Sequence, residues 1–415
     1  MRRGTKIQKL KQALPGIVKD VRHYAKPRVK LHNEGLGDYY TEGYRSLNQR
    51  EWKGVRDTAY DFASWLKVYG YMAVTLGKHP VALTKSFVRY PWMASYLTVA
   101  NMLDRHKLGL RGKQLRYTQE QFYGVVHNSV DVIAKIIERD ENLNSPNNKR
   151  AAKLRAKTVM FDEMTPSIIM AGFPMLDWID IAMSPVCLPG EVDQNANIMY
   201  VDAAERMGLA ADVCPLPSAE VGCAIVDDYP QVGSSFITSS MPCDGSLGAA
   251  LFMDRYMKKL PSFTLTPPQR FNEPETNAYA VKDLKNCILF IEETYHVKWD
   301  WDAFWEKAEE YNKTTQCMLD KWDVNCTPYP QVIGSALSLQ REYEFQTAAC
   351  LDPFMTKQDE KVTKMMLKGY EKDREADIIN TVRSYGAVRH IIIHILRPGQ
   401  NIHGESVHWS IWKVC

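Results

Sequence analysis

The sequence contains no long apolar run, although it has 415 residues. A helix that crosses a membrane needs about 18 or more predominantly apolar residues in succession. No stretch of this sequence reaches that length, so we expect no integral membrane segment. The charged first residues are not followed by an apolar core segment, so we also expect no secretory signal.

The sequence also has little net charge, because 52 Lys and Arg stand against 49 Asp and Glu and leave +3. So small an excess favours no nucleic-acid partner. The basic residues gather at the N-terminus, where residues 1–30 hold ten Lys or Arg and a single acid, Asp20. Apolar residues recur there at helical spacing, namely Ile7, Leu10, Leu14, Ile17 and Val21. An amphipathic helix packed on its own protein is the favoured interpretation; an anionic membrane surface, a transit peptide and a cap on a neighbour are the alternatives.

Cysteines are few and show no paired spacing. The nine are odd in number and scattered, at positions 187, 214, 223, 243, 287, 317, 326, 350 and 415. This pattern excludes a disulfide framework. It favours a reducing compartment, and we expect a cytoplasmic protein.

The length predicts two or three domains, at roughly 150 residues for each. Residues 51–140 have the apolar periodicity of helices with little strand signal, which predicts a helical N-terminal region over residues 1–150. The polar stretch 142–155, which contains Ser145-Pro146-Asn147-Asn148, is the expected linker.

After residue 150 short apolar runs alternate with helical patterns, which is typical of a parallel sheet with helical crossovers. The expected strands are 167–171, 234–238 and 263–265, and the expected helices between them are 201–208 and 245–259. We therefore predict an α/β domain over residues 151–278.

Two long helices are expected next, over 280–295 and 301–322, within a helical segment that spans 279–388. Asp300 or Asp302 is expected to cap the second helix. A buried strand over 389–399 then opens a second α/β domain, residues 389–415, which we expect to be truncated.

Two cysteines stand out, Cys214 after Asp212-Val213 and Cys243 before Asp244-Gly245. Each is expected where a strand gives way to a loop, which is where α/β proteins carry their chemistry. They are 29 residues apart, too far for one short CxxC motif. From the residues alone, metal ligation and a buried structural thiol both remain open. The Asp244-Gly245-Ser246 run predicts either an anion site at a helix start or an ordinary helix cap.

The other cysteines and the late histidines favour simpler roles. Cys223 is expected in the core, Cys287 and Cys317 are expected to pack within helices, and Cys187 is a possible substitute ligand. His390 and His394 fall in a strand-like run, where residues four apart lie about 13 Å from each other. We therefore do not expect a zinc site from that pair.

The order of these features resembles the catalytic subunits of the 2-hydroxyacyl-CoA dehydratase and benzoyl-CoA reductase family. The resemblance runs from Val159 to the C-terminus. It is carried by the loop 212–214, the Cys243 loop after a strand, the strand 263–265 before a long helix pair, and the turn 296–302 between those helices.

The resemblance implies a flavodoxin-like parallel sheet, a helical insertion and a 4Fe-4S cluster with Cys214 and Cys243 as ligands. A third ligand would come from the second α/β domain, and this sequence offers no cysteine that matches it. The implied protein is a subunit of an iron–sulfur 2-hydroxyacyl-CoA dehydratase, a lyase that removes water from an acyl-CoA thioester through a ketyl radical. The implied partners are a homologous second subunit and an ATP-dependent activator protein. A benzoyl-CoA reductase-type subunit and a non-catalytic scaffold subunit are the alternatives.

Overall fold

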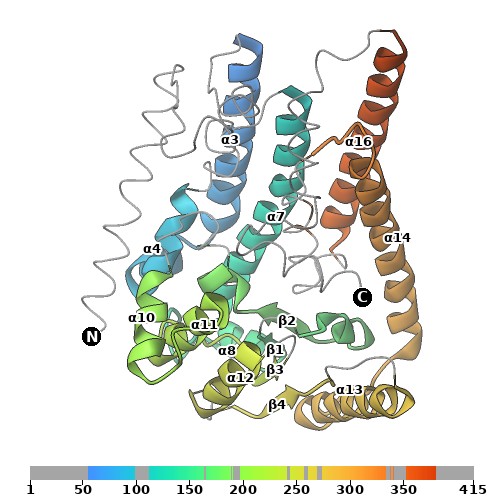
Figure 1. Cartoon of the computed structure of the whole chain (residues 1–415). Coiled ribbons are helices and arrows are strands. Elements are labelled where there is room, and N and C mark those ends of the chain that lie inside the picture. Colours follow the sequence, from blue (N-terminus) through green and yellow to red (C-terminus); the bar gives the residue numbers. More distant parts are fainter. Residues whose placement is uncertain are drawn as a thin grey trace.

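The computed structural model describes residues 55–98, 112–162, 165–187, 189, 197–240, 244–256, 260–268, 273–332, 337, 340 and 352–379. The N-terminal half contains the elements α3 (Val55–Leu76), α4 (Pro80–Arg89), η1 (Pro91–Thr98), α7 (Gly112–Arg139), α8 (Lys149–Arg155), β1 (Thr158–Phe161), η2 (Ser167–Gly172), β2 (Asp177–Asp180) and η3 (Met183–Cys187). From residue 198 onward the elements are α10 (Ile198–Arg206), α11 (Pro215–Ile225), β3 (Ser235–Ser239), α12 (Asp244–Tyr256), β4 (Ser262–Leu265), α13 (Pro274–Tyr295), α14 (Trp301–Asn325) and α16 (Pro353–Ile379). The long helices α3, α7, α14 and α16 rise from a layer that holds the sheet and the shorter helices (Figure 1).

The sheet is built from four parallel strands in the order β2-β1-β3-β4. This is the order of the first four strands of a flavodoxin-like sheet. Strands are added to one side of β1 first (β2) and then to its other side (β3 and β4), so the strand order reverses between β1 and β3, which pair in parallel with Phe161 opposite Ile237. The α/β class with helical regions, expected from the sequence, is therefore confirmed.

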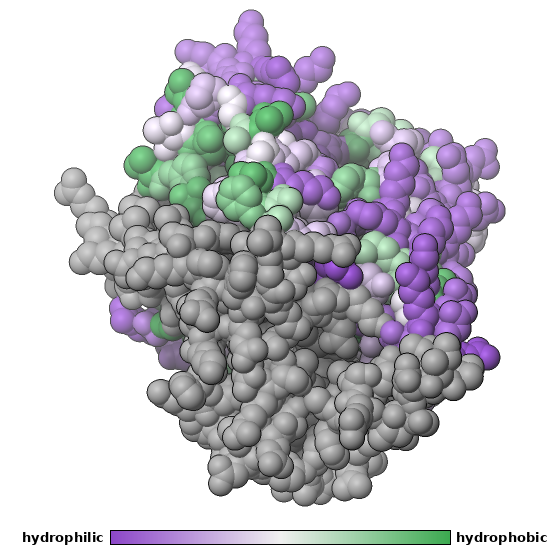
Figure 2. Space-filling view, turned by 90° about the horizontal axis from the view of Figure 1, so that it is seen from above, coloured by the Kyte–Doolittle hydropathy of each residue, from purple (hydrophilic) through white to green (hydrophobic). Residues whose placement is uncertain are grey.

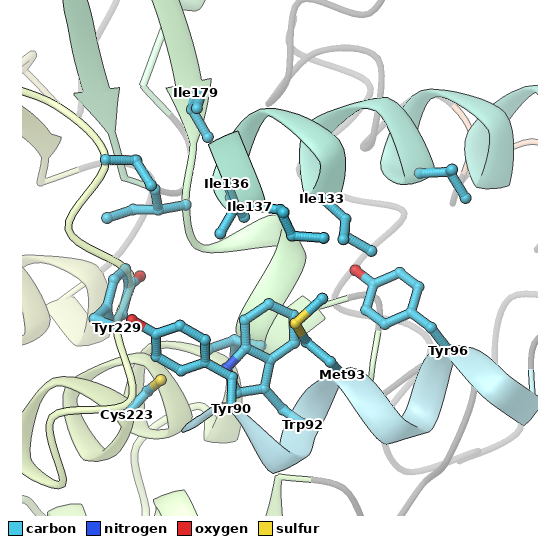
Figure 3. Close-up of a cluster of buried hydrophobic side chains, with 14 of the residues drawn as sticks. Tyr90, Trp92, Met93, Tyr96, Ile133, Ile136, Ile137, Ile179, Cys223 and Tyr229 are labelled. Carbon is cyan, nitrogen blue, oxygen red and sulfur yellow. The ribbon is translucent and has the colours of Figure 1, made fainter. Parts of the chain in front are cut away.

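One face of the sheet forms the larger core. Side chains alternate across a strand, and Met160, Ile179 and Phe236 point to this face. There they meet a cluster that includes Tyr90, Trp92, Met93, Ile133, Ile136, Ile137, Cys223 and Tyr229 from helices α7 and α11, segment 90–93 and the loop before β3 (Figure 3). The N-terminal helices thus pack directly on the α/β sheet, and the expected domain boundary at residue 150 stays a prediction.

The opposite face is covered by η2, α13 and the turn before α14. Val159, Phe161 and Ile237 point to this side and pack with Cys287 and Ile291 of α13. Because the central strands β1 and β3 are buried on both faces, a polar side chain on either of them has to find a partner inside the protein.

Most expected elements are confirmed, and their ends move by a few residues. Asp300 caps α14, since its carboxylate accepts a hydrogen bond from the Ala303 amide at 3.0 Å. The expected strand at 167–171 is wrong: these residues form the 3₁₀ helix η2, because the chain turns tightly at Pro166, whose carbonyl accepts a hydrogen bond from the Ile169 amide at 3.1 Å. A short buried apolar run does not by itself distinguish a strand from a helix.

The expected linker at 142–155 is ordered and consists of turns and helix α8, and its role as a connection between two domains stays a prediction. Asn148 caps α8 by accepting a hydrogen bond from the Ala151 amide at 3.1 Å. The basic segment 1–30, the strand 389–399 and the histidines 390, 394, 403 and 408 lie outside the described residues.

Hydrophilic and hydrophobic side chains lie side by side on the described surface seen from above (Figure 2). Among the described helices, none has both the length and the apolar character that a membrane crossing requires.

A buried carboxylate joins three segments on the larger core. Asp140, fully buried at the end of α7, accepts hydrogen bonds from the Tyr90 hydroxyl at 2.6 Å and from the Gln231 amide at 2.9 Å. Burial raises the pKa of Asp140 to about 6, although these hydrogen bonds oppose the rise. The folded protein therefore binds a proton at Asp140 more tightly than the unfolded chain does.

This difference predicts a pH-dependent stability. Between about pH 4 and pH 6 the folded state holds the proton that the unfolded state has lost, so the free energy of unfolding falls as the pH rises. The shift of about two pKa units corresponds to about 3 kcal/mol. Urea unfolding at a series of pH values should show this fall in the wild type and should lose it in Asp140→Asn.

Asp177, the first residue of β2, offers a matched control. Burial alone would raise the pKa of Asp177, but Lys135 and Arg139 outweigh it and lower the pKa below its ordinary value. Asp177→Asn should therefore shift the unfolding free energy by an amount that does not change above about pH 5. An Asp140→Asn profile parallel to that of the wild type would contradict the prediction.

Candidate functional site

The ends of β1 and β3 form the topological switch point of the sheet. Ligands of open α/β sheets bind in the crevice outside this point, at the carboxyl ends of the strands. Asp162 directly follows β1, and its amide donates to the Ile237 carbonyl at 3.0 Å. Its carboxylate accepts a hydrogen bond from the Thr238 hydroxyl at 2.5 Å. Both side chains are buried, so this pair ties the two strand ends together.

The chain leaves β3 at the same edge. Ser239 and Ser240 are buried, and the Ser240 amide donates to the Leu265 carbonyl of β4 at 2.9 Å. Residues 241–243, which include Cys243, lie outside the described residues, and α12 begins at Asp244. The structure therefore does not test whether Cys243 acts as a ligand.

Cys214 is the N-cap residue of α11. Its backbone is extended, with φ −48° and ψ 130°, and Pro215 takes the first helical position, which suits the fixed φ of proline. The Cys214 carbonyl accepts hydrogen bonds from the Ser218 amide at 3.4 Å and the Ser218 hydroxyl at 2.9 Å. The Cys214 side chain does not cap the helix, and the residue is exposed.

The expectation that a strand leads into Cys214 is wrong. Residues 207–213 form turns after α10, so the thiol stands at the junction of two helices. These helices cross closely, because a Cβ at Gly222 would lie 1.8 Å from the Tyr200 carbonyl oxygen. The close crossing holds α11 against α10.

Helices α11 and α12 begin at the same edge of the sheet. Helix α12 joins the parallel neighbours β3 and β4, so it must run antiparallel to the strands. Helix α11 is the last helix before β3 and packs along α12: Val221 and Ala249 share a buried cluster, against which Ile225 and Phe252 pack one turn further along each helix. Cys214 and the first residue of α12 therefore lie at the edge where the strands end.

The other described cysteines differ from Cys214 in their surroundings. Cys223 and Cys287 are buried, as expected, and burial raises the pKa of the Cys287 thiol to about 12. Burial also raises the pKa of Cys317, which is half-buried within α14. Cys187 is half-buried at the end of η3, and Cys326 is exposed at the C-terminal end of α14. Among the described cysteines, then, Cys214 and Cys326 have exposed side chains.

The described residues contain no group of three or more His, Cys, Asp or Glu side chains placed to hold a metal ion. A complete ligand set is thus not assembled within the described part of the chain. Any cluster bound at Cys214 would need further ligands from residues outside that part or from another polypeptide.

Sequence reasoning missed the Asp162–Thr238 pair. Its two members are 76 residues apart in the chain, and the pairing of β1 with β3 brings them together. The available signal was an acid directly after the apolar run Val159-Met160-Phe161, but that run was not recognised as a strand.

Residues 192–386 match the family model of 2-hydroxyglutaryl-CoA dehydratase, D-component. The matched segment begins just before α10 and contains both Cys214 and Cys243. No curated protein matches the chain. The matched segment, a little under half of the chain, is thus similar to a component of a 2-hydroxyacyl-CoA dehydratase.

Proposed function

We propose that the protein is a subunit of an iron–sulfur dehydratase that removes water from a 2-hydroxyacyl-CoA thioester, with Cys214 and Cys243 as cluster ligands. The observation that carries the proposal is the exposed Cys214 at the start of α11, on the edge of the sheet that holds the switch point. This position lies inside the segment that matches a dehydratase component.

The residues at this edge suit an iron–sulfur cluster. Clusters are held by thiolates on loops and helix starts, because soft sulfur binds iron well. Cys214 offers its side chain at a helix start, and the loop with Cys243 leads into a helix packed alongside. When bound, the cluster would supply an open iron for the substrate oxygen and a relay for one electron.

The chain's own residues would position this loop. The Asp162–Thr238 hydrogen bond fixes the end of β3, and the segment with Cys243 leaves the strand two residues later. We assign Asp162 a positioning role for that reason. It acts on the loop through Thr238.

The overall reaction balances as the loss of water. The C2–O bond of the substrate breaks, a proton leaves C3, and a C2=C3 double bond forms. In the proposed ketyl-radical route, one electron enters from an ATP-dependent activator protein and is returned at the end, so no net oxidation occurs. The family model that matches is named for a D component, and we propose that this chain likewise works with a homologous second subunit.

Iron and acid-labile sulfide in the anaerobically purified, reconstituted full chain test the proposal. We expect about four of each per chain, since a 4Fe-4S cluster contains four irons and four sulfides. The same preparation after exposure to air is the comparison, and it should lose iron and its brown colour. Iron near zero after reconstitution would contradict the proposal and favour the scaffold alternative.

A further inference from the structure

The start of α14 presents two exposed tryptophans. The exposed fraction is 56% for Trp301 and 60% for Trp305, and their rings stack one helical turn apart with centroids separated by 6.5 Å. Exposed carboxylates surround them. We call Trp301, Asp302, Trp305, Glu306 and Glu309 the acidic tryptophan face.

The face is held rigidly by the core beneath it. Trp299 packs edge-on against the buried Phe173, with centroids 5.2 Å apart, and Trp301 packs against Trp299 at 5.4 Å. The Asp300 amide donates to the Gly172 carbonyl at 2.9 Å, which fixes the start of the helix. Large aromatic side chains fixed in this way lose little conformational entropy on binding, and they are typical anchors of protein interfaces.

The charge of the face determines which partner suits it. The only cation of α14 within its first ten residues is Lys307, and it already pairs with Glu310 at 2.9 Å. Asp302, Glu306 and Glu309 therefore leave a net negative surface around the two indoles. Such a face suits a segment that combines apolar anchors with several Lys or Arg side chains.

Two other described surfaces are lined by more basic than acidic side chains and so suit that segment less well. Helix α16 displays a row of lysines at positions 357, 361, 364 and 368. The groove along α4 has a volume of about 680 Å³ and is lined by Lys85 and Arg89 as well as by Val81 and Val88. Although Lys361, Lys364 and Arg89 pair with acids, neither surface offers a group of exposed carboxylates like that of the acidic tryptophan face.

The chain itself contains a segment of the required kind. Residues 1–30 carry ten Lys or Arg, one acid and five spaced large apolar residues (Ile7, Leu10, Leu14, Ile17 and Val21). We propose that residues 1–30 bind the acidic tryptophan face of the same chain. This proposal does not depend on the cluster or on the dehydratase activity.

The chain is long enough for this contact. Residues 31–54 separate the segment from the start of α3, and 24 residues span up to about 80 Å when extended. By comparison, α7, with 28 residues, is about 42 Å long.

Hydrogen exchange of the full chain, followed by mass spectrometry, tests the proposal. Amides of residues 1–30 should exchange at least about tenfold faster in Trp301→Ala/Trp305→Ala and in Glu306→Gln/Glu309→Gln than in the wild type. Raising the salt from about 0.05 M to about 0.5 M should also speed exchange in the wild type, because charge attraction is screened. Glu371→Gln/Glu375→Gln, at exposed acids of α16, is the matched control and should leave the exchange unchanged.

Three outcomes would overturn the proposal. Equal exchange of residues 1–30 in the wild type and in both face variants would mean that the segment does not bind there. Protection that appears only as the protein concentration rises would identify a second copy as the occupant. Protection that appears only with anionic phosphatidylserine vesicles would identify a membrane surface. Unchanged far-ultraviolet circular dichroism in each variant shows that the fold is retained, as expected for exposed side chains.

Discussion

Replacing Cys214 with serine is expected to lower the iron bound per reconstituted chain at least about tenfold. A serine oxygen is a poor substitute for thiolate because it is harder and stays protonated at neutral pH, so the cluster loses one of its anchors. The fold should tolerate the change, since Cys214 is an exposed N-cap residue and serine is among the preferred residues at that position. Iron analysis beside circular dichroism separates loss of the ligand from loss of the helix.

Cys326→Ser is the matched control for this experiment. Cys326 is also an exposed helix-cap residue, but it caps the C-terminal end of α14, whereas Cys214 caps the N-terminal end of α11. We expect its iron content to equal that of the wild type, and we expect Cys243→Ser to lose iron as Cys214→Ser does. Full iron in Cys214→Ser would remove Cys214 from the ligand set and leave the family match without its proposed site.

The sequence was informative where local chemistry alone decides the structure. Helix α14 was expected because its apolar residues recur at helical spacing and Asp300 precedes it, and Asp300 is its cap. Strand β3 was expected from an apolar run bounded by serines. In both elements the residues that form the structure are neighbours in the chain.

Strands β1 and β2 were missed because of how short parallel strands are built. Each has four residues, and β2 reads Asp177-Trp178-Ile179-Asp180, with an acid at both ends. Arg139 and Lys135 of α7 form salt bridges with Asp177, so these two cations compensate the negative charge of its carboxylate. Periodicity contains no information about such distant partners.

The candidate site likewise combines a residue that local sequence reveals with a pair that only the fold brings together. Cys214 was found from its local sequence, but the strand expected before it does not exist. The Asp162–Thr238 pair could not be found from spacing, because only the strand order β2-β1-β3-β4 places the two residues together. Residues that depend on topology in this way need a structure before they can be assigned.

Helix α16 lies within the helical segment expected over 279–388, but its bounds were not predicted, and it contains the partner of an internal charge. Lys321 of α14 is fully buried and forms a salt bridge with Asp359 of α16, which is 1% exposed. Gln340 joins the two, donating to Asp359 at 2.9 Å and accepting from Lys321 at 3.3 Å. One of the acidic residues in the polar sequence of α16, Asp359, therefore faces the protein interior.

Lys321→Met is expected to lower the free energy of unfolding by about 3–5 kcal/mol. The substitution leaves the Asp359 carboxylate buried without its cation, and an uncompensated buried charge has a cost of that size. Urea unfolding followed by circular dichroism measures the effect as a shift of the midpoint. Lys364→Met is the matched control, because Lys364 is 77% exposed and pairs with Glu360 at 3.5 Å, where a loss of about 0.5 kcal/mol or less is expected.

The double variant Lys321→Met/Asp359→Leu distinguishes the buried charge from simple loss of packing. Removing both partners eliminates the uncompensated carboxylate, and apolar replacements of similar volume are often neutral or stabilising. We therefore expect the double variant to be more stable than Lys321→Met alone, so that the two substitutions are strongly non-additive. Additive losses would show that the two side chains act independently and that α14 and α16 are held together by the surrounding apolar residues, such as Met318 and Val362.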